Sequence, residues 1–142
     1  MTIGAILEGK GSEVVSVACD TMLREAVELL ADRRIGAMPV LKGAEVVGII
    51  SERDIIQCLK GNGADILDWE VERVMTAPAI TVTRDVPVLV ALSMMTRRRI
   101  RHLPVLEGGE VIGIVSIGDL VAHRIAHIER EAEAMRNYIQ NA

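Results

Sequence analysis

Two serine–aspartate pairs with the same spacing are the residues best suited to chemistry in this chain. Ser51 and Asp54 lie in the heptapeptide GIISERD, and Ser116 and Asp119 lie in GIVSIGD. A serine three residues before an acidic residue can form a capping box at the start of a helix. A glycine-containing strand that runs into a helix also offers free N–H groups, a hydroxyl and a carboxylate, which can hydrogen-bond sugar hydroxyls close to a phosphate. Each pair therefore predicts a helix cap, a ribose-binding corner, or both.

The two pairs lie in two copies of one longer segment. Residues 35–56 (IGAMPVLKGAEVVGIISERDII) align without a gap with residues 100–121 (IRHLPVLEGGEVIGIVSIGDLV), and 11 of the 22 aligned positions are identical. Such self-similarity indicates two copies of one supersecondary unit. Each copy has the pattern of a strand, an amphipathic helix, two apolar strands and a second helix. The sequence predicts an α+β fold of two β-α-β-β-α units, with residues 1–66 as the first repeat and its N-terminal segment, and residues 67–126 as the second.

Residues 118–140 differ from the first copy and predict a long C-terminal helix. Apolar residues recur there at spacings of 4, 3, 4, 3 and 4, and charged residues surround them. This is a heptad-like stripe. Because a lone helix would expose it, we expect the stripe to pack on its own module or on a second subunit, and we favour the subunit. The stripe consists of Val121, Ile125, Ile128, Ala132, Met135 and Ile139.

The second copy carries cationic residues that the first copy lacks. Arg101 and His102 stand where the first copy has a Gly-Ala pair. Arginine offers a bidentate fork to phosphate, and histidine gains charge as the pH falls; surface-exposed edge residues are the simpler alternative. Arg53, which corresponds to a glycine in the second copy, and Lys10 are weaker candidates for phosphate binding.

The composition argues against several classes of protein. The net charge is -4, whereas a nucleic-acid-binding protein would normally present a basic face. With no Phe, one Trp and one Tyr, a flat ligand would have to lie between aliphatic walls. The two cysteines are far apart and indicate reduced thiols. No membrane-length apolar run or signal peptide is recognisable, so we expect a cytoplasmic protein that binds neither membrane nor nucleic acid.

The duplicated pattern hhPVhxxxxhhGhhSxxDh, in which h is an apolar residue, resembles a tandem pair of CBS domains, the cystathionine-β-synthase type repeat. The resemblance covers residues 1–126, and the Pro-Val, the Gly and the SxxD recur in both copies. It implies two repeats related by pseudo-twofold symmetry that associate into flat homodimers. It also implies a regulatory Bateman module that binds AMP, ADP or ATP, or sometimes S-adenosylmethionine or NAD(H), in clefts between the repeats.

The resemblance also implies roles for individual residues. Ser51 and Asp54 would hold one ribose, and Ser116 and Asp119 another, with Arg101 and His102 near the phosphate. We expect one high-affinity pocket, which pairs the first corner with this Arg-His step, and a weaker second pocket. The walls around the adenine would be Met38, Pro39, Val40, Leu103, Pro104 and Val105.

The leading hypothesis is therefore a regulatory adenine-nucleotide sensor without catalysis, acting as a homodimer on an unidentified target protein. A ligand-independent adaptor module is the second hypothesis, and an NAD(H) or S-adenosylmethionine sensor is a variant of the first. An enzyme such as a nucleotide hydrolase is a third. No nucleophile lies beside a base in a recognisable motif, and we expect no catalytic cofactor or metal. The sequence leaves open which adenosyl ligand binds, how many pockets are occupied and how a dimer is oriented.

Overall fold

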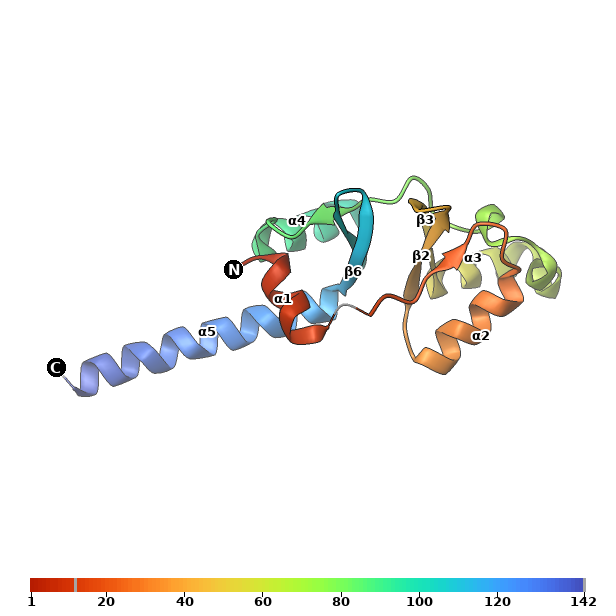
Figure 1. The fold of residues 1–142 in the computed structure, drawn as a ribbon. Helices are drawn as coiled ribbons and strands as arrows, with labels where there is room; N and C mark the ends of the chain where they lie inside the picture. The colour runs from red at the N-terminus through yellow and green to blue at the C-terminus, as the bar shows by residue number, and fades with distance from the viewer. Residues whose placement is uncertain (12, 142) are drawn as a thin grey trace.

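The computed structural model describes residues 1–11 and 13–141, and its elements follow the doubled pattern of the sequence (Figure 1). The predicted α+β class with two β-α-β-β-α units is confirmed. The first unit comprises β1 (Val17–Ala18), α2 (Leu23–Arg33), β2 (Ala37–Lys42), β3 (Glu45–Ser51) and α3 (Glu52–Asn62). The second comprises β4 (Val82–Thr83), α4 (Val88–Arg98), β5 (His102–Glu107), β6 (Glu110–Ser116) and α5 (Ile117–Gln140). The remaining elements are α1 (Ile3–Lys10) and the 3-10 helices η1 (Gly63–Asp68) and η2 (Val71–Arg73).

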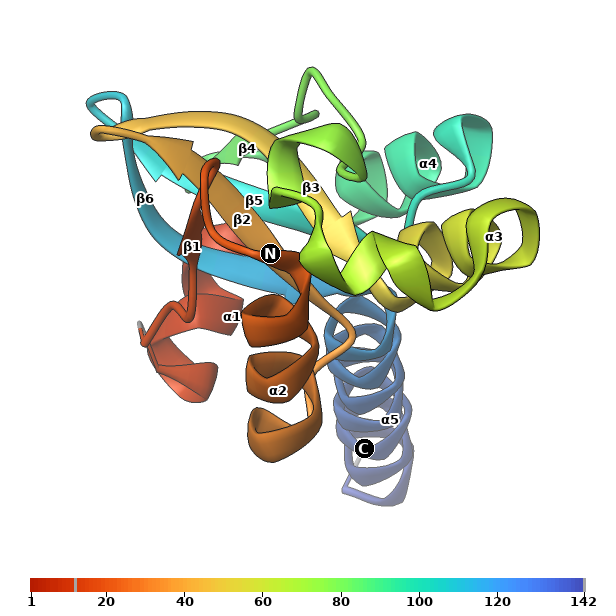
Figure 2. The same ribbon diagram turned by 90° about the vertical axis from the view of Figure 1, so that its right-hand side faces the viewer.

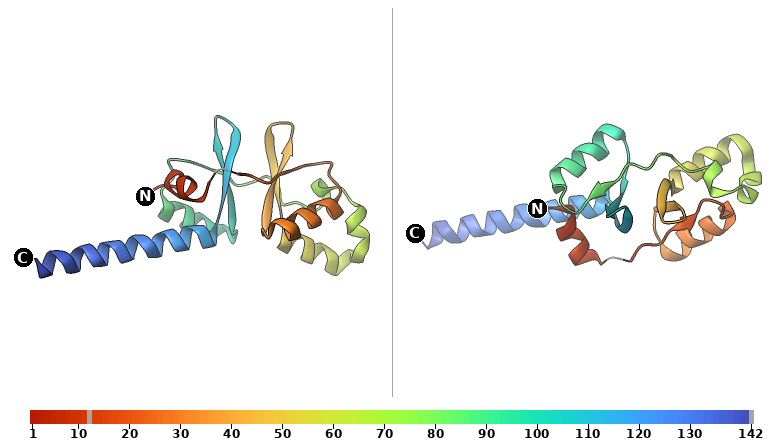
Figure 3. Two further views of the ribbon diagram at one scale, coloured as in Figure 1. Left: turned by 60° about the horizontal axis from the view of Figure 1, so that its bottom comes forward. Right: turned by 45° about the horizontal axis from the view of Figure 1, so that its top comes forward.

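Each unit contains one three-stranded sheet of the same topology. The strand orders are β1-β2-β3 and β4-β5-β6, with a parallel first pair and an antiparallel second pair in both sheets. The two sheets face each other in the middle of the molecule, and β3 contacts β6 (Figures 1 and 3). Helices α1 and α4 lie on the outer face of the second sheet, and α2 and α3 lie on the outer face of the first (Figures 1 and 2). This arrangement places the two copies of the Ser-x-x-Asp corner near the seam between the repeats.

The buried side chains form one hydrophobic core in each repeat. In the first repeat Leu23, Met38 and Ile50 have no exposed surface, and in the second the same is true of Leu103 and Leu120. Strands β2 and β5 are apolar over several consecutive residues because helices cover one of their faces and the opposite sheet lies on the other. No helix within the described residues is long and apolar enough to cross a bilayer.

The N-terminal helix α1 packs on the second repeat, although the sequence places it next to the first. Ile3 and Leu7 are buried in the second core. The backbone N–H of Ile3 donates to the carbonyl of Val86 at 2.9 Å, and that of Val88 donates to the carbonyl of Met1 at 3.1 Å. The sequence analysis grouped the N-terminal segment with the first repeat because the two are adjacent in the chain. In space, helix α1 packs on the second repeat.

The connection between the repeats closes the first core in the same way. Ile66 in η1 and Val71 in η2 are fully buried in the first repeat. The N–H of Val71 donates to the carbonyl of Thr21 at 2.8 Å, and that of Leu23 donates to the carbonyl of Trp69 at 2.8 Å. Each repeat is therefore closed by the segment that immediately precedes the other repeat in the chain.

Candidate ligand-binding cleft

A cavity of about 280 Å³ lies between the repeats. Small-ligand sites have volumes of about 300 to 1,000 Å³, so this cavity is at the lower end for a nucleotide-sized molecule. It is formed by the end of β3 with the start of α3, by the linker between the repeats, and by the residues that lead into β5. Its lining residues are Gly36, Ile49, Ser51, Glu52, Arg53, Asp54, Thr76, Pro78, Ala79, Ile80, Arg99, Ile100, Arg101 and His102.

Ser51 and Asp54 form one polar corner of this cavity. Ser51 is the N-cap of α3, and its Oγ accepts the N–H of Asp54 at 3.2 Å. The Asp54 carboxylate accepts the N–H of Ser51 at 3.0 Å and its hydroxyl at 2.9 Å. The predicted capping box is therefore present, and both side chains also line the cavity. Ser51 and Asp54 therefore cap helix α3 and also lie where a ligand in the cavity could reach them.

Thr76, from the linker, completes the first corner. Its hydroxyl donates to Asp54 Oδ1 at 2.7 Å, and its backbone N–H and carbonyl pair with those of Ile49, both at 2.9 Å. All the hydrogen bonds of Asp54 come from neutral donors, and none of the ion pairs among the described residues involves it. These three hydrogen bonds leave about one acceptor site of the carboxylate for a further hydroxyl donor.

Cationic side chains line the same cavity. Arg53 lies in the first turn of α3, Arg101 precedes β5, and both are exposed. Arg99 joins them, since α4 ends there in a left-handed conformation with φ of 55°. The structure therefore brings the Ser51–Asp54 corner together with Arg53, Arg101 and His102, and it adds Arg99, which was not among the candidates from the sequence.

His102 is half-buried, and its ring lies against Gly36. A Cβ atom at Gly36 would be 3.3 Å from the ring, so the glycine makes room for the imidazole. Burial lowers the pKa of His102 below its usual value of 6.5, and the ammonium of Lys10 adds to this effect while Asp119 and Glu52 oppose it. His102 is thus mostly uncharged at pH 7, and its charge appears at lower pH than for a free histidine. The arginines supply the positive charge of the cavity near neutral pH.

The expected adenine walls lie elsewhere. Met38 and Val40 belong to the first core, Leu103 and Val105 to the second, and all four have no exposed surface. The prolines Pro39 and Pro104 are buried as well, and none of these six residues lines the cavity. The apolar wall is formed by Ile49, Pro78, Ala79, Ile80 and Ile100 instead. The linker residues were missed because they lie outside the repeated segment. The signal in the sequence was the apolar run 77–80, which contains Pro78.

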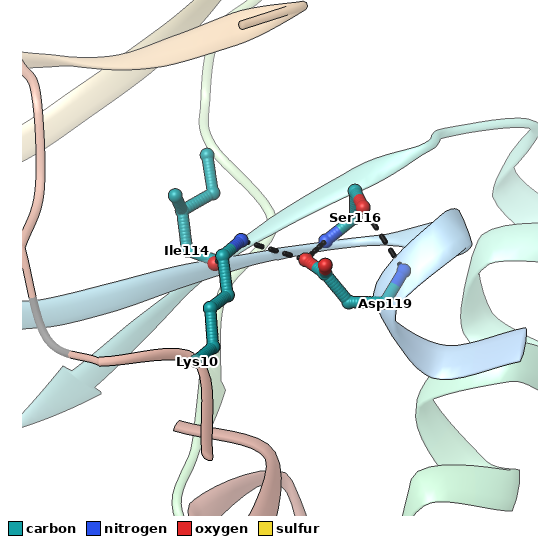
Figure 4. A network of polar contacts seen from close by, with 4 residues as sticks. All are labelled: Lys10, Ile114, Ser116 and Asp119. Carbon is teal, nitrogen blue, oxygen red and sulfur yellow. Dashed lines mark hydrogen bonds and ion pairs between the residues drawn. The ribbon is translucent and has the colours of Figure 1, made fainter. Parts of the chain in front are cut away.

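The second corner, formed by Ser116 and Asp119, holds a lysine (Figure 4). It has the same capping box, with the N–H of Ser116 donating to Asp119 at 2.8 Å and the N–H of Asp119 donating to Ser116 Oγ at 3.1 Å. The ammonium of Lys10 lies 2.6 Å from Asp119 Oδ2 and donates to the carbonyl of Ile114 at 2.9 Å. Lys10 is therefore placed at the second corner and does not line the cavity.

Lys10 and Thr76 make the same two contacts in the two copies. Each donates to the aspartate of its corner and to a backbone carbonyl of the neighbouring strand, that of Ile114 or Ile49. The difference is charge, since Lys10 neutralises Asp119. Partial burial acts to raise the pKa of Asp119, but the hydrogen bonds from Lys10 and Ser116 outweigh it and the pKa is lowered. The first corner is anionic, and the second is neutral overall.

Comparison with known proteins agrees with the fold. The family model "CBS domain" matches residues 11–61 and 71–125, and the chain therefore belongs to the CBS-domain family as a tandem pair. The crystal structure of the CBS-domain containing protein ATU1752 from Agrobacterium tumefaciens is 35% identical, with a TM-score of 0.84 over 87% of this chain and 99% of that one.

Two similar structures contain adenosine compounds. The CBS domain protein PAE2072 from Pyrobaculum aerophilum, complexed with AMP, is 30% identical, with a TM-score of 0.74 over 84% of this chain and 89% of that one. The CBS domain pair of MJ0100, in complex with 5'-methylthioadenosine and S-adenosyl-L-methionine, is 25% identical, with a TM-score of 0.79 over 89% and 98%.

The curated relatives differ in length. The CBS domain-containing protein CBSX3, mitochondrial, of Arabidopsis thaliana is 33% identical. The match covers 98% of this chain and 72% of that protein. Three further Arabidopsis thaliana relatives are much longer, and the chain spans 22–23% of them.

Proposed function

We propose that this CBS pair is a non-catalytic regulatory module that binds an adenine nucleotide of the AMP, ADP or ATP type in the cavity between its repeats. The observation that carries the proposal is one anionic serine–aspartate corner facing three arginines in a single cavity. The neighbouring protein that is complexed with AMP supports the ligand class. The module would act as a homodimer on a separate target protein, and a cytoplasmic location remains a prediction from the sequence.

Each part of a nucleotide has a matching group in the cavity. Asp54 and Ser51 would accept and donate hydrogen bonds to the ribose hydroxyls. Arg53, Arg99 and Arg101 would bind the phosphate, because guanidinium groups form bidentate charge-assisted hydrogen bonds with it. The aliphatic side chains of the linker would pack on the adenine faces.

The same features rank the alternative ligands. S-adenosylmethionine carries a positive sulfonium group and no phosphate, so three arginines disfavour it relative to an adenine nucleotide. NAD(H) is a dinucleotide, and the cavity of about 280 Å³ is small for it. A ligand that binds the native state must stabilise it. If no adenine nucleotide raised the thermal unfolding midpoint of this chain, the result would favour the adaptor hypothesis.

Arg101 tests whether the arginines recognise phosphate. We expect the wild-type chain to bind AMP more tightly than adenosine, and Arg101→Ala to weaken AMP binding about tenfold while adenosine affinity stays the same. The reason is that a charge-assisted hydrogen bond contributes about 1.5–3 kcal/mol and adenosine has no phosphate. Isothermal titration measures both, with Arg24→Ala as a control because that exposed arginine lies outside the cavity. Equal affinities of the wild-type chain for AMP and adenosine would contradict this assignment.

Lys10 tests why the two corners should differ. We expect one AMP per wild-type chain, because Lys10 neutralises Asp119 and occupies its corner. Lys10→Met keeps most of the side-chain length and removes the charge, so a second, weaker binding event should appear in the titration. If the stoichiometry stayed at one, the packing of α1, and not the Lys10–Asp119 ion pair, would be what closes this corner to AMP.

A further inference from the structure

The apolar stripe of α5 is exposed along its whole length. Val121, Ile125, Ile128, Met135 and Ile139 have exposed fractions between 42% and 67%, and Ala132 is exposed as well. From the sequence we expected the stripe to pack either on its own module or on a second subunit. In the single chain it does not pack on its own module. The residues of α5 that do contact the module belong to another face of the helix: Leu120 is buried, and His123 and His127 are half-buried.

The second half of α5 extends away from the rest of the protein (Figures 1 and 3). Isolated helices shorter than about 12–15 residues are marginal in water, and most helical stability comes from packing of an apolar face. A projecting helix with a continuous apolar stripe is therefore best stabilised by a partner along that stripe. The 4-3 spacing of the stripe is the heptad spacing of coiled coils.

The charges beside the stripe complement those of a second copy of the same helix. With Ile125 and Ala132 at heptad position a, Glu129 and Arg136 occupy e positions, and Arg124 and Glu131 occupy g positions. In a parallel pair each g residue faces the e residue of the partner's next heptad. Arg124 would then face Glu129 of the second copy, and Glu131 would face Arg136. Both pairs join opposite charges, and twofold symmetry repeats each of them.

We propose that α5 pairs with α5 of a second copy as a parallel two-stranded coiled coil, which holds two CBS pairs side by side at its N-terminal end. A second copy suits the stripe because the helix carries both signs of charge in the positions that complement itself. A purely acidic or purely basic partner helix would meet repulsion at one of each pair. Ala132 leaves little apolar area at the centre, so the association is expected to depend on concentration.

Sedimentation equilibrium of the full chain tests the pairing. We expect a dimer whose dissociation constant rises at least tenfold in Ile128→Asp, while Ile56→Asp on α3, at 65% exposure, has no effect. Arg136→Glu should weaken the dimer by placing like charges opposite each other, and Glu131→Arg combined with Arg136→Glu should restore it. Circular dichroism checks that each variant stays folded. A monomer at about 100 µM, or a dimer insensitive to Ile128→Asp, would overturn the proposal.

Cross-linking tests the orientation. In a parallel pair Ile139 faces the same residue of the second copy, so Ile139→Cys in a Cys19→Ser/Cys58→Ser background should form a disulfide-linked dimer under mild oxidation. The absence of that cross-link in a sample that sediments as a dimer would rule out the parallel arrangement. Neither measurement involves nucleotide, so the result is independent of whether the cavity binds one.

Discussion

AMP affinity is expected to fall about a hundredfold in the Asp54→Asn variant. Asp54 carries the unneutralised negative charge of the first corner, and Thr76 and Ser51 hold it with neutral donors. A hydrogen bond to a charged group contributes about 1.5–3 kcal/mol, and a ribose hydroxyl would donate to this carboxylate. Loss of about 2.7 kcal/mol corresponds to a hundredfold change in the dissociation constant. Isothermal titration with AMP and with adenosine measures the change, which should be similar for both.

Asp119→Asn is the matched control for this substitution. Asp119 occupies the same capping box in the second repeat, so both variants lose the same helix-capping charge. Because Lys10 already neutralises Asp119, AMP affinity should stay within about twofold of the wild-type value. An equal loss in both variants would indicate a general effect on stability, and no loss in either would remove the first corner from the site.

A methyl group at Gly48 is expected to destabilise the protein by about 1–3 kcal/mol and to weaken AMP binding. In Gly48→Ala the added Cβ would lie 2.7 Å from the carbonyl oxygen of Thr76 and 2.7 Å from the Met75 sulfur. The sulfur can move, but that carbonyl is held by the N–H of Ile49 at 2.9 Å. Relief of the clash must shift Thr76, which also donates to Asp54. Urea unfolding and AMP titration measure the two effects.

Gly113→Ala provides the comparison in the second repeat. Its Cβ would come within 2.6 Å of a Leu7 methyl group, so the clash is with one side chain of the second core and not with the backbone of the linker. We expect a smaller loss of unfolding free energy than for Gly48→Ala, and unchanged AMP affinity. If both variants lost the same stability while AMP affinity held, the link between the Thr76 backbone and the ligand corner would be contradicted.

The repeat explains why much of the fold was predictable. An ungapped alignment over 22 positions defines two equal units, and both serine–aspartate steps begin a helix as the capping signature implies. The contrast between Arg101-His102 and the equivalent Gly-Ala pair also identified two residues that the structure places in the cavity. Local signals of this kind survive folding because they are properties of one chain segment.

Features that depend on distant segments were not predictable. The sequence shows Lys10 as a free cation, yet its charge is used against Asp119, which is 109 residues away. Apolar strand residues such as Met38 and Leu103 can face a core or a cleft, and the repeat pattern does not distinguish the two. The lowered pKa of His102 results from burial by neighbours that the sequence does not order in space.

The exchange of closing segments between the repeats makes the pair indivisible. If the chain were divided between the repeats, Ile3 and Leu7 would remain attached to the first repeat. The second core, in which they are buried, would then lose them. The two repeats are therefore expected to fold and unfold as one unit, because each core is completed by a segment that lies beside the other repeat in the chain.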